Sequence, residues 1–466
     1  PSPMADFGYD VADYVDIDPL FGTLADFDAL LAEAHQRGIR VLLDFVPNHS
    51  SDRHPWFLAS RSGRESLRRD WYIWHDPAPG GGPPNNWLGV FGGSAWTLDD
   101  ATGQYYYHAF LPQQPDLNWR NPEVRVAMAE ALRFWLDRCV DGFRVDVIWH
   151  LIKDDRFRDN PVNPDWPPGG DPYAALCPLY TTDRPEVHEV IRDLRGLMDG
   201  YPDRVLIGEI YLPVERLVAY YGVDLDGVHL PFNFQLLQAP WHARELDQLI
   251  REYEALLPQG GWPNWVLSNH DRPRIASRVG LAQARVAAML LLTLRGTPTL
   301  YYGDEIGMED VAAARGRDPA GRDPCRTPMQ WDASPCAGFT AGTPWLPLAA
   351  NWSEVNVATQ VADPRSMLNL HRRLIGLRRQ EPALSLGAYT PIEAEGDLLA
   401  YVRRADGADD MLVVLNLGSE PRSLELPLDI GGSLALSTHL DRDGEAISRH
   451  IALRADEGVI VRTPRR

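Results

Sequence analysis

The chain has 466 residues, of which 44% are hydrophobic, 10% aromatic and 24% charged, a composition that excludes a disordered or fibrous protein. Its 45 basic and 65 acidic residues give a formal charge of -20. Such a surface repels phosphate backbones and anionic lipids, so we expect no nucleic acid partner. A chain of this length forms one large domain with additions, or two to three domains.

Nothing in the sequence indicates a membrane segment or export. The most apolar stretch, residues 286–294, is well short of the roughly 20 residues that cross a bilayer. The four cysteines show no CxxC pair and no zinc-finger spacing, which favours free thiols in a reducing compartment. No secretory leader precedes the first motifs. We therefore expect a cytoplasmic protein without a membrane span.

The first predicted elements are a helix and a buried strand. Thr23 and Asp26 match a capping box, and apolar residues at helical spacing follow until Gly38. Residues 38–46 are then mostly apolar over the length of one strand. Such a run is typical of a parallel strand that is covered on both faces.

The same alternation continues along the chain and predicts an α/β fold, a (β/α)8 TIM barrel. Only six strands are found where such a barrel has eight, so we expect the first strand, the first helix and the second strand to precede Pro1. Helical patterns begin at Pro122 and Val187, with further helices at 281–294 and 363–379; strands are expected at 142–147, 205–210, 228–234, 265–268 and 297–302.

Two segments break this alternation. Between residues 52 and 117 it gives way to tryptophans, glycines and prolines, which predicts a subdomain inserted after the third barrel strand, with most aromatic residues serving its packing. After residue 386 the period changes to that of strands separated by turn signals, which predicts an antiparallel β domain over 386–466. The barrel is expected in 1–51 and 118–385.

Polar residues gather where the predicted barrel strands end. In such barrels the loops that follow the strands converge on one mouth, and the active groups lie there. Reading the ends of the third, fourth, fifth and seventh strands gives Asp44 with His49, Arg144 with Asp146, Glu209, and His270 with Asp271.

Several acids at one mouth suit glycoside hydrolysis. In retaining enzymes two carboxyl groups about 5 to 5.5 Å apart share the work: one attacks the anomeric carbon and the other protonates the leaving oxygen. Arg144 lies two residues before Asp146, so strand alternation turns both side chains to one face, where the guanidinium keeps the carboxylate ionised and oriented. The imidazoles of His49 and His270 suit hydrogen bonds to sugar hydroxyls without a cofactor.

Simpler interpretations apply to the same residues. A strand-end aspartate often only caps the next helix, and Arg144 also suits a structural ion pair with Asp44. His49 and His54 do not fit the HExxH pattern of a zinc site, and no carboxylate stands at the required interval, so we expect no metal there.

Seven motifs carry a resemblance to a known family. In chain order they are ADFGYDVADY, DFVPNHSSD, QPDLNW, DGFRVDVI, GEI, SNHDRPR and RTPMQWD, between residues 5 and 332. Together they resemble the α-glucosidases of the α-amylase superfamily, glycoside hydrolase family 13, near the oligo-1,6-glucosidases.

The resemblance implies residue roles. Asp146 would be the nucleophile, Glu209 the general acid and then base, and Asp271 the transition-state stabiliser. Arg322 or Arg326 would pair with Asp6, and this pair would grip the terminal sugar and favour cleavage from the non-reducing end. The pocket for the terminal glucose would be lined by Asp6, Tyr9, His49, Arg144 and His270.

The activity that the resemblance implies is that of a retaining exo-acting α-glucosidase on short oligosaccharides or disaccharides. Val147, after the nucleophile, is the residue type of oligo-1,6-glucosidases and indicates α-1,6 links, whereas residues 208–213 depart from that group, so both α-1,4 and α-1,6 links stay open. No cofactor is implied; the calcium loop of relatives would precede Pro1.

Two alternatives to hydrolysis stay open. A transglucosidase, or a sucrose or trehalose isomerase, would use the same chemistry on a different acceptor. A catalytically inactive subunit with the same fold, like the transporter heavy chains that resemble this family, would bind without reaction, although here all three acids are present. The sequence does not indicate an oligomeric state.

Overall fold

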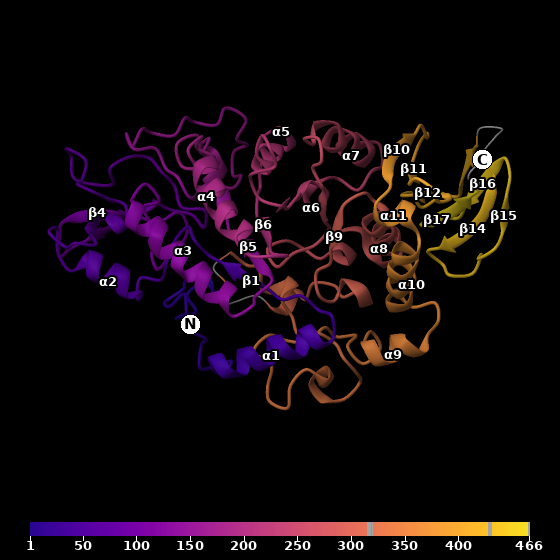
Figure 1. Ribbon diagram of the computed structural model, residues 1–466, viewed down its shortest axis with the longest axis horizontal. Coiled ribbons are helices and arrows are strands. Elements are labelled where there is room, and N and C mark those ends of the chain that lie inside the picture. The colour runs from indigo at the N-terminus through magenta and orange to yellow at the C-terminus, as the bar shows by residue number, and fades with distance from the viewer. Residues whose placement is uncertain (315–317, 319, 427–430, 465–466) are drawn as a thin grey trace. The chain divides into compact units, whose positions relative to one another are not determined.

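The computed structural model describes residues 1–314, 318, 320–426 and 431–464. It divides into two compact units (Figure 1): unit 1 comprises Pro1–Ile210 with Arg216–Pro231, and unit 2 comprises Tyr211–Glu215 with Phe232–Arg466.

Unit 1 is built on a parallel sheet with the strand order β1-β5-β6-β7. Its strands are β1 (Leu42–Phe45), β5 (Gly142–Val145), β6 (Val205–Gly208) and β7 (Leu230–Pro231). The register places Asp44 of β1 beside Arg144 of β5. All four strands lie within the runs that the sequence predicts. The expectation that β1 is covered on both faces is wrong: Leu42 is 39% exposed, because β1 lies at the edge of this sheet.

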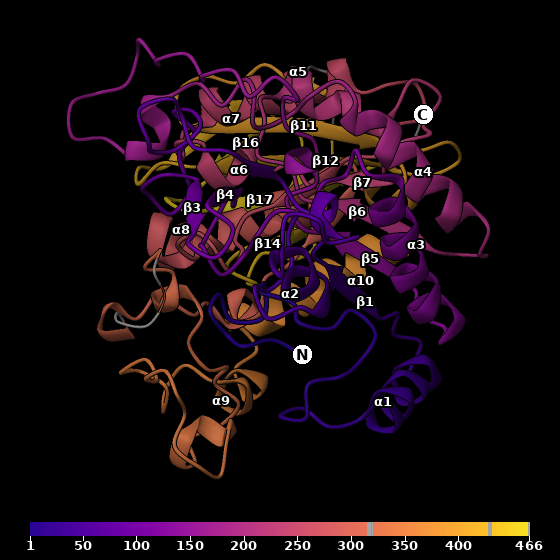
Figure 2. The same ribbon diagram turned by 90° about the vertical axis from the view of Figure 1, so that its left-hand side faces the viewer.

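The helices of unit 1 follow their local sequence signals. Helix α1 (Leu24–Gln36) begins at the capping box, in which Thr23 and Asp26 bond each other's backbone. Helix α3 (Pro122–Asp137) begins with proline after an asparagine cap, and α4 (Val187–Asp199) buries its apolar stripe. Figure 2 shows α3 and α4 together on one side of β5 and β6.

A small antiparallel sheet, ordered β2-β4-β3, interrupts this pattern. It follows helix α2 (Pro55–Arg61) and consists of β2 (Trp74–His75), β3 (Trp96–Asp99) and β4 (Gln104–Tyr107). Trp87 and Trp96 stack with ring centroids 5.8 Å apart inside its aromatic core. These aromatic residues therefore serve packing, as the sequence indicates.

Unit 2 begins with two parallel strands, β8 (Asn264–Val266) and β9 (Thr297–Thr299). Between and before them lie α6 (Gln235–Gln238), α7 (Ala243–Leu256) and α8 (Ile275–Thr293), and the four-residue helix α5 (Val214–Leu217) stands at the boundary of the units in the chain. Helix α8 starts six residues before the expected position. It contains a kink at Gly280, whose φ of 78° and ψ of 159° are not helical. The expected start at residue 281 falls directly after this kink, so the prediction describes the second of the two helical pieces.

Helix α8 is also the one described helix that is long and apolar enough to cross a membrane by length and composition. Within the structure, however, 61% of that 18-residue window is buried. It contacts α10 and strands of the C-terminal sheet. This is the environment of a core helix, whose apolar residues are covered by protein.

The rest of unit 2 is a helical segment followed by antiparallel strands. Strands β11 (Leu398–Arg404) and β12 (Asp410–Asn416) are buried on both faces, since one face joins the core of the C-terminal sheet and the other meets α7, α8 and α11 (Pro382–Ser385). The expected helix at 363–379 begins only at Met367, because Ser366 caps it. The elements are α9 (Val357–Ala362), α10 (Met367–Gln380), α11 (Pro382–Ser385), β10 (Ala388–Ile392), β11 (Leu398–Arg404), β12 (Asp410–Asn416), β13 (Arg422–Glu425), β14 (Gly432–Ser437), β15 (Ala446–Ile447), β16 (His450–Leu453) and β17 (Gly458–Thr463).

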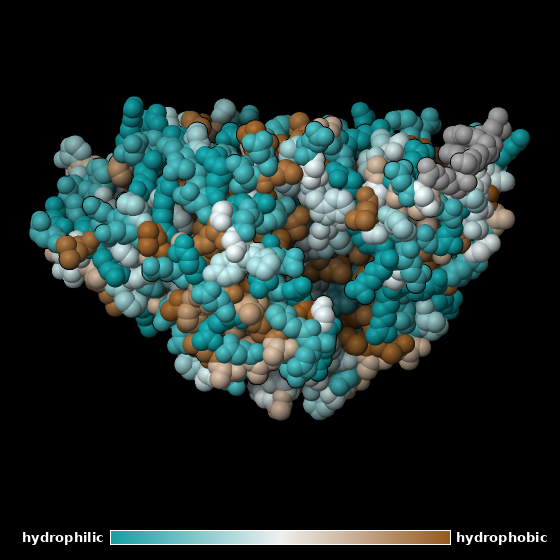
Figure 3. All heavy atoms as spheres, in the orientation of Figure 1, coloured by the Kyte–Doolittle hydropathy of each residue, from teal (hydrophilic) through white to brown (hydrophobic). Residues whose placement is uncertain are grey.

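Six strands form the larger C-terminal sheet, in the order β10-β11-β12-β17-β14-β15, and β13 pairs with β16. Its residues begin at Ala388, close to the expected start of an antiparallel β domain. The boundaries of the expected domains stay predictions. On the face drawn in Figure 3, hydrophilic residues predominate and hydrophobic ones form small patches, as the charge of the chain leads one to expect.

Candidate active site

The carboxyl ends of three neighbouring strands place four charged side chains together in unit 1. Asp44 lies in β1, Arg144 in β5, Asp146 directly after β5, and Glu209 directly after β6. Because the strands are parallel and in register, their carboxyl ends meet at one edge of the sheet. The sequence predicted this gathering from strand ends alone.

The Arg144 guanidinium is the centre of this group. Its Nη1 donates to Asp146 Oδ1 at 3.0 Å and to Asp44 Oδ1 at 2.5 Å, and its Nη2 donates to Glu209 Oε2 at 2.6 Å. Asp146 and Glu209 are only 6% and 3% exposed. One planar guanidinium therefore bonds both predicted catalytic carboxyl groups and Asp44. The ion pair expected with Asp44 and the one expected with Asp146 are both present.

Val147 fixes Glu209 from the backbone. Its N–H donates to Glu209 Oε2 at 3.0 Å, and its φ of 36° lies in the left-handed region. A β-branched residue adopts that conformation at a cost, which persists only where the surroundings impose it. The turn after Asp146 thus aims a donor at the neighbouring carboxyl group.

The electrostatics correct one expectation. Burial raises the pKa of Asp146 well above its ordinary value, Arg144 lowers it, and the carboxylates of Glu209 and Asp44 raise it again. The arginine therefore orients Asp146 but does not offset its burial. Because Glu209 contributes to this increase, the protonation of the two carboxyl groups is coupled.

Asp6, Tyr9 and His49 lie together in unit 1, linked by Gln114. The Gln114 amide donates to Asp6 Oδ2 at 3.1 Å, and its nitrogen lies 3.0 Å from His49 Nε2. Tyr9 joins this group to the carboxylates, because its hydroxyl donates to Asp44 Oδ2 at 3.1 Å and accepts from Arg144 at 3.1 Å. Gln114 belongs to the QPDLNW motif but was not singled out from the sequence.

Both nitrogens of His49 have protein partners. Nδ1 accepts from the Asn48 amide at 3.1 Å, so Nε2 carries the hydrogen and lies 3.0 Å from the Tyr9 carbonyl oxygen. Burial lowers the pKa of His49 to about 4, so the ring is neutral near pH 7. Its expected hydrogen bond to a sugar hydroxyl stays a prediction.

The only lysine of the chain acts on this histidine through Asn48. Lys153 is 4% exposed and pairs with Asp116, which is fully buried, and its Nζ also donates to Asn48 Oδ1 at 2.6 Å. The Asn48 amide donates to Asp116 Oδ2 at 2.8 Å, so its orientation is fixed. Sequence reasoning missed this network, although a single lysine among 45 basic residues was a signal.

The remaining predicted site residues lie in unit 2. Asp271 Oδ1 accepts from Arg322 Nη1 at 3.2 Å and from Arg326 Nη2 at 3.1 Å, and the Arg326 Nε donates to the His270 carbonyl at 2.7 Å. Arg322 is also held by Asp318 at 2.7 Å. Both arginines thus meet Asp271. Their expected pairing with Asp6 stays a prediction, because Asp6 belongs to the other unit.

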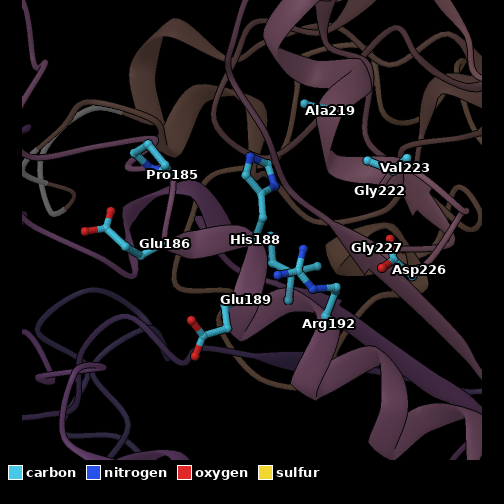
Figure 4. A pocket seen from close by; sticks show the side chains of 11 residues that line it. Pro185, Glu186, His188, Glu189, Arg192, Ala219, Gly222, Val223, Asp226 and Gly227 are labelled. Atoms are coloured by element: carbon cyan, nitrogen blue, oxygen red, sulfur yellow. The ribbon is translucent and has the colours of Figure 1, made fainter.

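One pocket of unit 1 lies elsewhere. Its volume is about 560 Å³, and Figure 4 shows Glu186 and Glu189 on one side of it and Val223 and Asp226 on the other. None of the candidate catalytic residues lines it. The described residues contain no group of three or more histidine, cysteine, aspartate or glutamate side chains that would suit a metal ion; the expectation that no cofactor is required stays a prediction.

Known proteins resemble this chain over most of its length. A sequence model of the alpha amylase catalytic domain matches residues 1–387. A probable alpha-glucosidase of Rhizobium meliloti (strain 1021) is 42% identical over 92% of this chain and 82% of its own length. The oligo-1,6-glucosidase of Parageobacillus thermoglucosidasius is 37% identical over 91% of this chain and 83% of its own length.

Two further relatives represent the alternative functions. The human amino acid transporter heavy chain SLC3A1 is 38% identical over 98% of this chain and 70% of its own length. The solved structure of the alpha-glucosyl transfer enzyme XgtA is 39% identical, with a TM-score of 0.92 over 99% of this chain and 90% of that chain.

The fold and the strand-end acids define the class of protein, a TIM-barrel enzyme that acts on carbohydrates. The expected (β/α)8 class with a C-terminal antiparallel domain is confirmed. The chain belongs to the α-amylase family of glycoside hydrolases.

Proposed function

We propose that this protein is a retaining exo-acting α-glucosidase that releases terminal α-linked glucose from short oligosaccharides or disaccharides. One observation carries the proposal: a single guanidinium, that of Arg144, contacts both Asp146 and Glu209. Groups held by the same cation are close enough to act on one glycosidic bond from two sides. The names of the relatives support the substrate class.

The proposed reaction has two steps. Asp146 attacks the anomeric carbon while Glu209 gives its proton to the leaving oxygen, so the glycosidic bond breaks and a covalent glucosyl-enzyme forms. Glu209 then removes a proton from water, which attacks the same carbon and releases α-glucose and a free Asp146. Asp271 would stabilise the oxocarbenium-like charge in both transition states.

The proton that the first step needs is held by the carboxyl pair. Burial and the neighbouring Glu209 raise the pKa of Asp146, so two carboxyl groups placed together retain a proton more readily than two separate ones. A bound sugar would separate the two groups. Arg144 and the leaving oxygen then favour an ionised Asp146 and a protonated Glu209, which is the state that attacks.

Exo action would rest on Asp6, Tyr9 and His49. Gln114 holds Asp6 and lies beside His49, so these polar groups form a fixed wall. A wall that hydrogen-bonds the hydroxyl groups of a terminal sugar leaves no room for another sugar unit of the substrate on that side. The proposal covers hydrolysis of α-1,4 links, α-1,6 links or both. It also includes a cytoplasmic location and activity without a cofactor.

Substitution of Glu209 tests the acid role. Glu209→Gln should abolish hydrolysis of maltose and isomaltose but retain release of fluoride from α-glucosyl fluoride, because fluoride leaves without a proton. Glu189→Gln, on the exposed face of α4, serves as the control and should not change either rate. Equal loss on both kinds of substrate in Glu209→Gln would contradict the assignment.

Transfer to a second sugar is the competing function that one comparison favours, because XgtA is an alpha-glucosyl transfer enzyme. Product analysis with maltose, isomaltose, sucrose and trehalose at high concentration separates the two: free glucose alone supports hydrolysis, and new disaccharides support transfer. The resemblance to a transporter heavy chain favours an inactive subunit, and any turnover excludes it.

A further inference from the structure

The loop that carries Asp271 is closed at its base by a buried serine. Asp271 lies between strand β8 and helix α8, within unit 2. The Ser268 hydroxyl oxygen accepts a hydrogen bond from the Ile275 N–H at 2.9 Å, so this bond joins the two ends of residues 268–275, the Asp271 loop. Ser268 is only 2% exposed. The position of Asp271 therefore depends on what holds the Ser268 side chain in place.

Asp304 reaches the base of this loop from the neighbouring strand. Strands β8 and β9 are parallel, so the segments that follow them leave from the same edge. Asp304 lies in the segment after β9 and is 5% exposed. Burial raises its pKa to about 7, whereas the Ser268 hydroxyl and Arg274 lower it. One group at each end of the Asp271 loop therefore stabilises the charged form of this carboxyl group.

Arg274 fixes the other end of the loop to the same segment. Its side chain is fully buried, and its Nη1 lies 3.9 Å from Asp304 Oδ1 and donates to the Tyr302 carbonyl oxygen. The guanidinium also lies over the rings of Tyr301 and Tyr302, 4.6 and 4.7 Å from their centroids. The Arg274 N–H donates to Asp310 Oδ1 at 3.0 Å. The end of the loop is thus held through both its backbone and its side chain.

The local backbone is adapted to this buried pair. Gly303 has a φ of 88°, and a Cβ atom there would lie 2.9 Å from Arg274 Nη1 and 2.6 Å from Met308 Sδ. The chain before Asp304 approaches the guanidinium closely because this residue has no side chain. A buried ion pair contributes little to stability by itself, because removing two charges from water costs about as much as their attraction returns. Fixed position, rather than stability, accounts for such a pair below a catalytic loop.

We propose that Asp304 is a positioning residue for Asp271: through Ser268 and Arg274 it keeps the Asp271 loop in one conformation. Arg322 and Arg326 bond the Asp271 carboxylate itself, whereas Asp304 acts on the backbone that carries it. The inference rests on the proposed function, in which Asp271 stabilises the charge of the transition state.

Kinetics of maltose hydrolysis test this role. Asp304→Asn should lower kcat about ten- to hundredfold, because Asp271 is displaced. The KM should stay within about twofold, since Asp271 acts on a charge that exists only in the transition state. Glu457→Gln is the matched control, because Glu457 is equally buried and pairs with Arg442 and Arg454 in the C-terminal domain. It should lower the melting temperature but leave kcat within about twofold well below that temperature.

A double-mutant cycle shows whether Asp304 acts through Asp271. Once Asp271→Asn has removed the carboxylate, Asp304→Asn should lower the hydrolysis of α-glucosyl fluoride no further than about twofold. Losses that add fully would show that Asp304 acts independently of Asp271 and would overturn the proposal. A kcat of Asp304→Asn equal to that of Glu457→Gln would overturn it as well.

Hydrogen exchange followed by mass spectrometry measures the loop without any reaction. Residues 268–275 should exchange about fivefold faster in Asp304→Asn than in wild type, the effect of one lost hydrogen bond, and at the wild-type rate in Glu457→Gln. Ser268→Ala, which keeps the buried pair, should show the same increase and the same loss of kcat, and it replaces Asp304→Asn if that variant does not fold.

The outcomes separate this inference from the proposed function. If the wild type cleaves no glucoside, the function fails, and hydrogen exchange alone decides the role of Asp304. Faster exchange of residues 268–275 in Asp304→Asn than in Glu457→Gln then supports positioning of the loop. Equal exchange in the two variants overturns it, whether or not the wild type is an α-glucosidase.

Discussion

Lys153 shows how one buried charge supports the candidate site. Burial lowers its pKa, whereas Asp116 raises it. Asp116 also accepts hydrogen bonds from Asn48 and from the Ala109 N–H at 2.7 Å. The lysine thus neutralises a carboxylate that water does not reach, and through Asn48 it sets which nitrogen of His49 carries the hydrogen.

Lys153→Met should lower the free energy of unfolding by about 3 kcal/mol or more, because it leaves Asp116 buried without its cation. Urea unfolding followed by tryptophan fluorescence measures this change. The control is Arg37→Met, which breaks the exposed pair of Arg37 with Glu33 and should cost less than about 1 kcal/mol. Similar losses in both variants would show that the buried pair is no more important than a surface pair.

Asp146 provides a pH-dependent prediction at the same scale. Because its pKa is raised in the folded protein, the wild type binds the proton more tightly when folded, so this contribution to stability is present at low pH and is lost as pH rises through the raised pKa. Asp146→Asn removes this loss of stability at high pH, because an amide has no proton to release. The variant should be inactive and melt at a higher temperature than wild type at pH 8, and the difference should shrink towards pH 4. A constant difference across this range would contradict the raised pKa.

At the scale of elements, β5 and β6 hold the two proposed catalytic carboxyl groups at a fixed separation. Gly142 makes this possible at the start of β5. A Cβ atom at this position would lie 2.1 Å from the Val205 carbonyl oxygen of β6, far inside contact distance. The strands therefore approach each other closely only because residue 142 has no side chain.

Gly142→Ala should separate the beginnings of β5 and β6, lower the melting temperature and reduce kcat strongly, since Arg144 no longer reaches Glu209. The matched control is Gly196→Ala in α4, where an added Cβ meets nothing within 4 Å and helix propensity improves by about 0.5–1 kcal/mol. Melting curves and maltose kinetics of both variants are the measurements. Tolerance of Gly142→Ala equal to that of Gly196→Ala would contradict the close approach.

At the scale of the whole molecule, the C-terminal sheet completes the core of unit 2. Thr293 at the end of α8 contacts the Tyr401 hydroxyl of β11 at 2.5 Å, and Gln283 of α8 donates to Asp456 at 2.6 Å. The buried Arg403 donates to the Thr293 and Gly387 carbonyl oxygens. The apolar side chains of α8 are therefore kept from water by the sheet that covers them.

A chain that ends at Leu386 should aggregate, because removal of the sheet exposes α8 to water. Size-exclusion chromatography and binding of a hydrophobic dye measure this exposure. Tyr401→Phe, which keeps the sheet and removes only one hydrogen bond, should remain soluble and lose about 1 kcal/mol of stability. A truncated chain that elutes as a folded monomer would show that α8 is covered by something other than the sheet.

The sequence by itself determined the alternation of helices and strands and the acids at strand ends, but it did not reveal the helix α7. Local patterns were sufficient for these. The Thr23 capping box begins α1, because a cap depends on residues beside it in the chain, and short apolar runs mark β1 and β5 to β9. One helix boundary was wrong, because Ser366 caps α10 later than the apolar pattern suggests. The expected start at residue 281 matches the part of α8 that follows the kink at Gly280.

Only the tertiary structure decided which charges meet. Arg144 contacts Glu209, 65 positions away, and Lys153 contacts Asn48, 105 positions away. No period or motif encodes such pairs, since they depend on how strands and loops come together. Burial then sets the pKa of Asp146, because desolvation of a carboxyl group depends on the atoms that surround it in space rather than on those beside it in the chain.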